Sequence, residues 1–188
     1  MIQYDITRSE ADLRGILELQ QKNFADTVSP EEAVSQGYVT VRHELSLLQR
    51  MHSEAPAIIA KDKDHIAGYC LAMPKSFKND IPVLVPMFDI IDDLSFNDEP
   101  LRDIDYIVSG QVCVDKAYRG QGIFDGLYHQ YREYYKDSHP CIITEILSAN
   151  RRSISAHQRV GFGILHRYSD PDDRQWDIVL WDWNTPAP

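Results

Sequence analysis

A glycine-rich turn in the second half of the chain has the composition of an anion-binding site. The run Val112–Ile123 reads VCVDKAYRGQGI, so an apolar strand leads into a turn that contains Gly120 and Gly122. Residues without side chains let backbone N–H groups approach a ligand closely, and a following helix adds unpaired N–H groups and its positive dipole end. Arg119 adds a permanent charge. A phosphate or pyrophosphate suits this turn, although the same glycines could serve only the φ angles of a strand-to-helix turn.

Two other phosphate-binding motifs fit these residues less well. A nucleotide P-loop needs Lys and then Ser or Thr after its last glycine, but Ile123 follows Gly122. A dinucleotide fingerprint needs glycine at its sixth position, where, counted from Gly120, the chain has Asp125. Glu145 could mimic the ribose-binding acid of that fold, so a nicotinamide-dependent oxidoreductase stays open as the weaker alternative.

A second block, NRRSISAHQRVGF, spans Asn150–Phe162. Together with the glycine-rich turn it resembles the GCN5-related N-acetyltransferase (GNAT) family. The acetyl-coenzyme A (acetyl-CoA) signature of that family has Arg or Gln, then Gly three positions later, then Gly or Ala two further on. Arg119 and Gly122 match this signature, whereas Phe124 departs from it. The resemblance covers about Tyr106 to Trp183, and only the order of elements supports it before that.

The resemblance implies an α/β protein with the acyl-CoA N-acyltransferase (GNAT) fold, whose mixed, mostly antiparallel sheet is splayed to admit acetyl-CoA and is flanked by helices. It implies acetyl-CoA as the cosubstrate and no metal. The implied contacts are backbone groups of Gln111, Val112, Cys113 and Val114 for the pantetheine arm, Arg119, Gly120, Gln121, Gly122, Ile123 and Phe124 for the pyrophosphate, and Asn150 and Ser153 further along. Without the resemblance, Asn150 is equally well a helix cap with Ser153 solvated.

Acetyl transfer to an amine needs a neutral nitrogen, donors for the oxyanion and a proton source for the leaving thiolate. Many family members have a Tyr at the position of His157, so its imidazole is the candidate proton source, although a lone His on a helix usually packs or is solvated. Glu145 and Asp105 are candidate general bases, and Glu145 could equally be a structural acid. No cysteine lies in a nucleophile and base motif, which favours direct transfer in a ternary complex.

The first half of the chain predicts the elements that flank this machinery. Residues 2–6 alternate like a strand, and Ser9 caps a helix. A second helical stretch is predicted from Ser29 to about Arg50, and strands at 57–60 and 66–73 form a hairpin around residues 61–64. Prolines interrupt residues 74–103, which we expect to form a functional loop with short helical turns over the cleft.

The second half has clearer periodicity. The predicted elements are a strand over 106–114, a helix from Ile123 through Leu127, Tyr131 and Tyr134, a strand over Cys141–Leu147, a helix from Asn150 that ends before Gly161, and a hairpin of residues 164–168 and 176–183. At 188 residues the chain is predicted to be one N-acetyltransferase domain. Residues 1–103 would form its acceptor-side half and residues 104–183 its acetyl-CoA-binding half.

The composition and the N-terminal residues argue against several classes of protein. The net charge of −10 opposes binding to nucleic acid, and no apolar run is long enough to suggest a membrane span. The N-terminus lacks a signal sequence, so we expect a cytoplasmic protein. Cys70, Cys113 and Cys141 have no CxxC spacing and are expected to be small buried hydrophobes.

The sequence therefore predicts an N-acetyltransferase that moves an acetyl group from acetyl-CoA to a primary amine of a small molecule or peptide. A non-catalytic acyl-CoA sensor of the same fold stays open beside the oxidoreductase. The acids at Asp89, Asp92 and Asp93 are expected to be a solvated face; if they lined the cleft, they would attract a polyamine, an amino sugar or a lysine side chain. A homodimer is left open.

Overall fold

A mixed β-sheet forms the centre of the molecule in the computed structural model, which describes residues 1–24, 26–29 and 38–184. Its strands are β1 (Gln3–Ile6), β2 (Ile58–Asp62), β3 (His65–Met73), β6 (Ile107–Val114), β7 (Cys141–Leu147), β8 (Gly163–Ser169) and β9 (Gln175–Asp182). In the described residues, the seven strands of this sheet lie in the order β1-β2-β3-β6-β7-β9-β8, and of its neighbouring strands only β6 and β7 run parallel. A sheet with one parallel pair is not doubly wound, so the dinucleotide-binding alternative does not hold.

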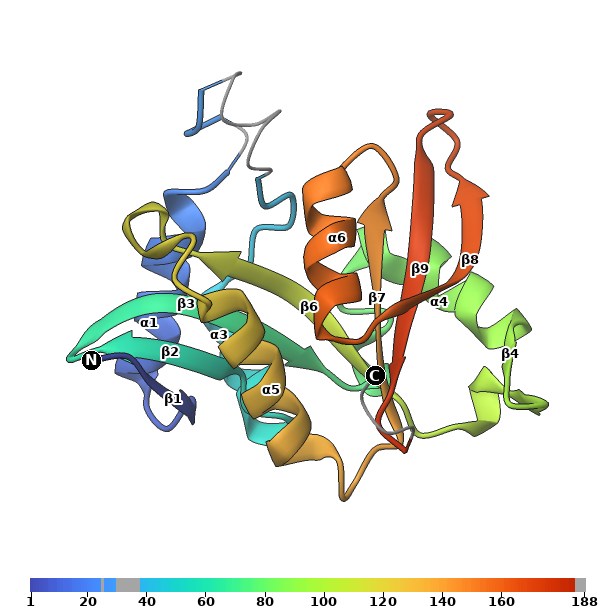
Figure 1. Cartoon of the computed structure of the whole chain (residues 1–188), viewed down its shortest axis with the longest axis horizontal. Coiled ribbons are helices and arrows are strands. Elements are labelled where there is room, and N and C mark those ends of the chain that lie inside the picture. Colours follow the sequence, from blue (N-terminus) through green and yellow to red (C-terminus); the bar gives the residue numbers. More distant parts are fainter. Residues whose placement is uncertain (25, 30–37, 185–188) are drawn as a thin grey trace.

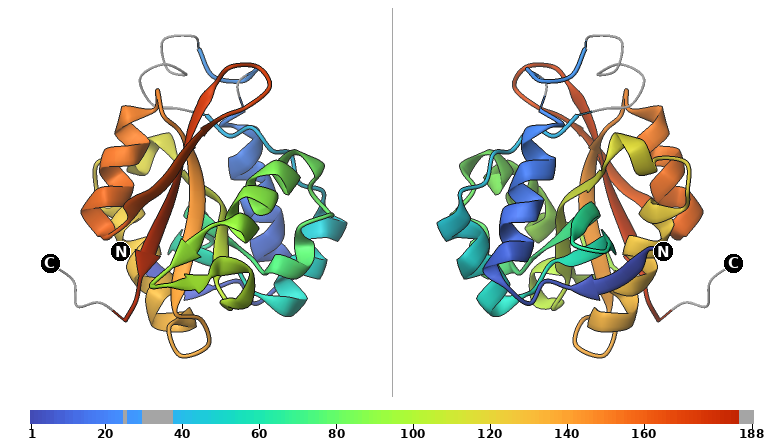
Figure 2. Two further views of the ribbon diagram at one scale, coloured as in Figure 1. Left: turned by 90° about the vertical axis from the view of Figure 1, so that its right-hand side faces the viewer. Right: turned by 90° about the vertical axis from the view of Figure 1, so that its left-hand side faces the viewer.

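Helices cover both faces of the sheet. They are α1 (Glu10–Gln21), α3 (Leu45–Glu54), α4 (Val85–Asp93), α5 (Ile123–Tyr135) and α6 (Arg151–Val160), with short 3₁₀ turns η1 (Lys75–Phe77), η2 (Pro82–Leu84), η3 (Leu101–Asp103) and η4 (Lys116–Tyr118). The buried side chains of α1, α3 and α4 pack on one face, and those of α5 and α6 on the other. Figure 2 shows the two helical layers on opposite sides of the strands. A small hairpin of β4 (Ser95–Phe96) and β5 (Glu99–Pro100) follows α4.

The sheet divides between β6 and β7. These strands pair only at Ile107 with Ile142 and at Val108 with Ile143, and then diverge (Figure 1). On its other edge β6 carries an irregularity at Gly110, because Leu71 of β3 pairs with Gln111 and the next residue of β3 pairs with Ser109. An extra residue bends the bulged strand, which turns β6 away from β7.

Several predicted elements are confirmed, including the first strand, the helix capped by Ser9, the strand Cys141–Leu147 and the closing hairpin. The helix predicted from Ser29 to Arg50 is confirmed over residues 45–50 and wrong over residues 38–44, and residues 30–37 lie outside the described residues. Residues 38–44 are not helical, and the helix runs instead from Leu45 to Glu54. The β-branched run at 39–41 disfavours a helix, and Val39 forms a bridge with Phe24.

The proline-interrupted segment 74–103 contains more regular structure than the sequence predicts. Pro82 and Pro86 stand in the first turns of η2 and α4, where the missing N–H costs nothing, so these prolines begin helices. The first hairpin also turns later than predicted: β2 continues through Asp62, and Lys63 takes the left-handed conformation with φ 57°.

Cys70, Cys113 and Cys141 are buried free thiols, as predicted, and burial raises the pKa of each to about 12. No helix within the described ranges is long and apolar enough to cross a bilayer. In the same part of the chain no group of three or more His, Cys, Asp or Glu side chains could hold a metal ion.

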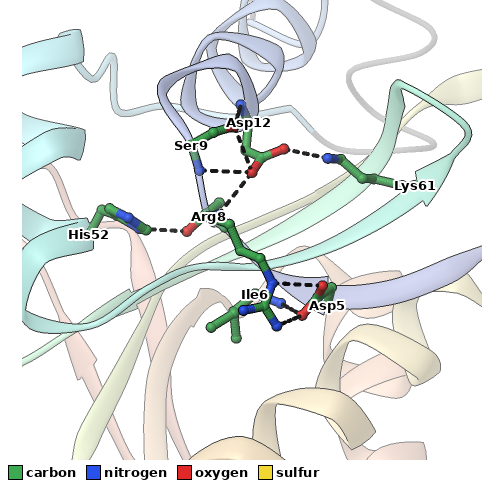
Figure 3. A network of polar contacts seen from close by, with 8 residues as sticks. Asp5, Ile6, Arg8, Ser9, Asp12, His52 and Lys61 are labelled. Atoms are coloured by element: carbon green, nitrogen blue, oxygen red, sulfur yellow. Dashed lines mark hydrogen bonds and ion pairs between the residues drawn. The ribbon is translucent and has the colours of Figure 1, made fainter.

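A polar network fastens the start of α1 to the sheet (Figure 3). Ser9 and Asp12 form a capping box, in which the Asp12 carboxylate also accepts from the backbone N–H of Arg8 at 2.8 Å and pairs with Lys61 of β2. Burial raises the pKa of Asp12, but the Lys61 ammonium and the backbone donors lower it more, so it lies below its ordinary value. The ionised carboxylate therefore stabilises the junction between α1 and β2.

Asp12→Asn should lower the free energy of unfolding by about 1 to 3 kcal/mol at neutral pH, because it weakens charged hydrogen bonds at a buried cap. A carboxylate with a lowered folded-state pKa stabilises fully above its unfolded pKa of 3.8, and this stabilisation is lost as the pH falls through the lower folded value. The difference between the variant and the natural chain should thus shrink toward acid in urea titrations. Glu10→Gln, which alters the exposed pair with Arg14, is the control and should change little. A pH-independent difference would contradict the assignment.

Candidate active site

The glycine-rich turn is an open cradle of backbone amides. Gly120 and Gly122 have φ of +76° and +77°, and a Cβ added at either would meet nothing within 4 Å. Gly122 is the N-cap of α5, so the unpaired N–H groups of that helix begin at the turn. The preceding 3₁₀ turn is fixed by Asp115, whose carboxylate accepts from the backbone N–H of Ala117 at 2.9 Å. The turn thus presents backbone amides at a helix N-terminus, and no atom of the described residues fills the space in front of its two glycines.

This cradle lies in a cavity of about 670 Å³, here called the cradle cavity. Of the predicted cofactor residues it collects Val112, Cys113, Val114, Arg119, Gly120, Gly122, Ile123, Phe124, Asn150 and Ser153. Two predicted residues lie elsewhere. Gln111 lines a second cavity, and the exposed Gln121 lines neither, since its side chain donates to the carbonyl of Ala117 at 3.1 Å.

Positive charge concentrates in the cradle cavity. Arg119 donates to Asn23 of the segment after α1 at 2.7 Å and to the carbonyl of Val114 at 3.2 Å, which fixes its guanidinium. Arg152 also lines the cavity, and both burial and the charge of Arg119 lower its pKa. Two like charges that face one space are stabilised by an anion between them. The sequence did not lead us to predict Arg152. The pattern that could have indicated it is a basic residue in the first turn of a helix, where the helix dipole favours acidic residues.

Asn150 and Phe124 resolve two ambiguities of the sequence. The Asn150 side chain accepts from the backbone N–H of Ser153 at 3.1 Å, so it caps α6 and lines the cavity at once. The Phe124 ring lies 5.0 Å from the rings of Tyr128 and His157 in the interface of α5 and α6. The departure from the motif at Phe124 therefore leaves the cradle open.

His157 is placed differently from the prediction of a proton source. It is 2% exposed and lines neither cavity of the described residues. Nδ1 lies 2.8 Å from the Ser153 carbonyl, which can only accept, so Nδ1 carries the proton and Nε2 accepts from the Tyr128 hydroxyl at 2.8 Å. Burial lowers the pKa of His157 to about 4. Its ring is neutral at pH 7 and both nitrogens are engaged, so this environment does not support proton donation.

The Tyr128 hydroxyl belongs to a longer buried chain of hydrogen bonds. Because it donates to His157, it accepts from Ser109 at 3.0 Å, and Ser109 in turn accepts from the Cys70 thiol at 3.2 Å. Thr144 of β7 donates to the Ser109 carbonyl at 2.9 Å, just past the last paired residues of β6 and β7. These bonds satisfy polar groups that the diverging strands leave without ladder partners.

The second cavity, of about 450 Å³, adjoins the first. Tyr38, Val39 and Val112 line both. The second cavity is further bounded by the η2–α4 segment, by residues 108–111 of β6, and by the β8–β9 hairpin. Two ligands could therefore meet where β6 and β7 separate.

Of the two predicted bases, only Glu145 lies in this second cavity. Burial raises its pKa, partly offset by the Tyr168 hydroxyl, which donates to it at 2.5 Å. Asp105 is exposed before β6 begins, lines neither cavity of the described residues, and acts electrostatically on His139. Asp89 and Asp92 pair with Lys78 at 2.7 and 3.0 Å and, like Asp93, line neither cavity.

Comparison with known proteins agrees with this geometry. Residues 16–162 match the model of the acetyltransferase (GNAT) family. No curated protein matches the chain. The fold is similar to that of the ribosomal-protein-S18-alanine N-acetyltransferase from Escherichia coli, at 13% identity and a TM-score of 0.63 over 100% of this chain and 97% of that one.

Two further similar structures contain acetyl-CoA. One is yncA, a putative acetyltransferase from Salmonella typhimurium, with 14% identity, a TM-score of 0.62, and coverage of 100% of this chain and 96% of that chain. The other is Arabidopsis thaliana NAA60, with 14% identity, a TM-score of 0.63, and coverage of 97% and 99%. At this identity the likeness establishes the fold.

Gly122→Ala should weaken acetyl-CoA binding about tenfold or more, since a Cβ both strains the left-handed backbone and enters the space in front of the amides. Isothermal titration measures the effect. Gly163→Ala is the matched control, because its Cβ also meets nothing within 4 Å but its backbone needs no positive φ. Equal weakening by both variants, or by neither, would contradict the cradle.

Arg152→Gln should weaken binding of inorganic pyrophosphate roughly tenfold, because one of two charges that face the cavity is lost. The salt dependence of the dissociation constant should also decrease. Arg14→Gln, at an exposed pair on α1, removes the same charge away from the cavity and should leave pyrophosphate affinity unchanged. Identical affinities for Arg152→Gln and the natural chain would rule out this role.

Proposed function

This chain belongs to the acetyltransferase (GNAT) family, and we propose that it transfers the acetyl group of acetyl-CoA directly to a primary amine in a ternary complex. One observation carries the proposal: a cavity lined by Arg119, Arg152 and the glycine-rich turn shares Val112 with a cavity that contains the half-buried carboxylate of Glu145. The acetyl-CoA bound in yncA and in NAA60, which share this fold, supports the choice of cosubstrate.

The residues of the cradle cavity fit acetyl-CoA. The amides at Gly120 and Gly122 and the guanidinium groups of Arg119 and Arg152 suit its phosphates. Beyond Val108, β6 no longer pairs with β7, so the backbone groups on that edge of its cavity-lining part, 112–114, are available to a pantetheine arm, except for the Val114 carbonyl, which accepts from Arg119. In this proposal residues 104–183 hold acetyl-CoA. The second cavity is the proposed acceptor cavity, and residues from both halves of the chain line it.

Glu145 is the proposed general base. An amine enters as an ammonium ion and must lose a proton before it can attack a thioester, and a carboxylate whose pKa is raised toward neutrality takes that proton more readily. Transfer from bound acetyl-CoA forms an N–C bond and breaks a C–S bond; of the two protons lost by the ammonium ion, one ends on the thiol and one in solvent. Tyr168 orients Glu145 by donating to it.

His157 is proposed to position the helices that border the cradle. Its two hydrogen bonds connect Tyr128 of α5 to the Ser153 carbonyl of α6, and its ring packs against Phe124. In this role the imidazole stays neutral through the reaction.

Glu145→Gln should lower kcat/KM for the amine at least about 100-fold at neutral pH, because the amide cannot accept the proton. In the natural enzyme the rate should fall as the pH drops through the raised pKa of Glu145, where the base becomes protonated. Tyr168→Phe removes a bond that lowers this pKa, so it should move the acidic limb to higher pH. Thiol release across pH, with acetyl-CoA affinity measured separately, tests both variants.

The outcomes separate enzyme from sensor. Acetyl-CoA binding without thiol release, across a panel of amines, would identify a non-catalytic acyl-CoA-binding protein. An unshifted acidic limb in Tyr168→Phe, with normal activity in Glu145→Gln, would remove the assignment of the base.

A further inference from the structure

The second cavity, which is the proposed acceptor cavity, has an apolar wall in addition to Glu145. The wall comes from η2 and α4 and consists of Val83, Leu84, Pro86, Met87 and Ile90. Val83 is 67% exposed, and Tyr38, which also lines the cavity, is 47% exposed. These are two of the few large apolar side chains that stand exposed in the described part of the chain. Apolar side chains gathered at a cavity mouth favour a ligand that covers them with its own carbon atoms.

Among the described charged residues that line this cavity, only Glu145 lacks an oppositely charged partner in the lining and could pair with a cationic ligand. Besides Glu145, the lining contains Asp170 and Arg174. Asp170 accepts from four donors, namely the backbone N–H groups of Asp172 and Arg174, the Arg174 side chain and the Trp176 indole, at 2.8 to 3.0 Å. Burial raises the pKa of Asp170, but these donors lower it to about 2. Its charge is matched by Arg174, which also pairs at 3.0 Å with Asp172 outside the lining, so Asp170 and Arg174 together give the lining no net charge.

We infer that the acceptor is a primary monoamine on an apolar body, with its ammonium group at Glu145 and its carbon atoms along the wall of η2 and α4. This inference rests on the proposed function. A diamine would bring a second ammonium ion to an apolar wall and to the neighbourhood of Arg174, and it would lose its hydration there without a partner. An amino sugar would leave hydroxyl groups unpaired on the same wall, and an amino acid would place a carboxylate near Glu145.

A matched ligand series tests the inference on the purified full chain. Butylamine, pentylamine and hexylamine should show kcat/KM values that rise about fourfold per methylene, as expected when each is buried. Hexylamine should exceed both 1,6-diaminohexane and 6-aminohexanoate by about tenfold or more. Amine titrations in the presence of saturating coenzyme A provide a second readout, in which the dissociation constants should follow the same order.

A change at the wall should reverse the preference. Val83→Asp adds an acid at a side chain that is already exposed, so folding should be preserved, and 1,6-diaminohexane should then be preferred over hexylamine. Ile164→Asp is the matched control: Ile164 is 44% exposed and lines neither cavity of the described residues, so the ligand order should stay unchanged.

The possible failures are distinguishable. If acetyl-CoA does not bind, the proposed function is overturned. If acetyl-CoA binds but hexylamine is no better than the diamine, or another amine is acetylated while no monoamine is, the monoamine class is overturned and the proposed acetyl transfer is untouched. A peptide amino terminus with higher kcat/KM than every monoamine would also overturn it, as would an unchanged ligand order in Val83→Asp.

Discussion

The site depends on the separation of β6 from β7, which pair in parallel at only two positions before they diverge. A sheet interior that opens exposes N–H and C=O groups, and each buried group must find another partner. Side chains supply these partners at the fork: Thr144 donates to the Ser109 carbonyl and Tyr131 to the Val108 carbonyl. Past this point the edge of β6 that faces β7 forms no ladder with it, and the proposed cosubstrate would use this edge. The separation of the strands is stable because the backbone carbonyls where it begins accept hydrogen bonds from side chains.

A buried chain of hydrogen bonds continues from the fork into α5 and α6. It runs from Cys70 through Ser109 and Tyr128 to His157. Every member is bonded, and a fully satisfied buried network holds its elements in one arrangement. This accounts for the two departures from the family pattern together. A Phe at 124 is tolerated because its ring packs against Tyr128 in a tilted arrangement and against His157 in a T-shaped one.

Local patterns in the sequence were sufficient for the elements whose signals are local. The cap at Ser9, the left-handed glycines and the strand Cys141–Leu147 follow from short-range rules. The helix at residues 45–54 was misplaced because Glu44, at its N-cap, provides no capping side chain and so no start signal. Burial was not readable either: His157 and Glu145 are both titratable residues in the predicted half, and only tertiary packing decides that one is enclosed and the other faces a cavity.

The two cavities explain how an acidic chain can carry a local concentration of positive charge. A chain with a net charge of −10 repels an anionic ligand at long range, so an anion needs a strong local field. Arg119, Arg152 and the N-terminus of α5 supply that field over a short distance. A cation is drawn by the overall charge and needs only one local carboxylate. In the proposed function, the acidic composition and the basic cradle therefore favour ligands of opposite charge in two adjoining cavities, which share Val112 of β6.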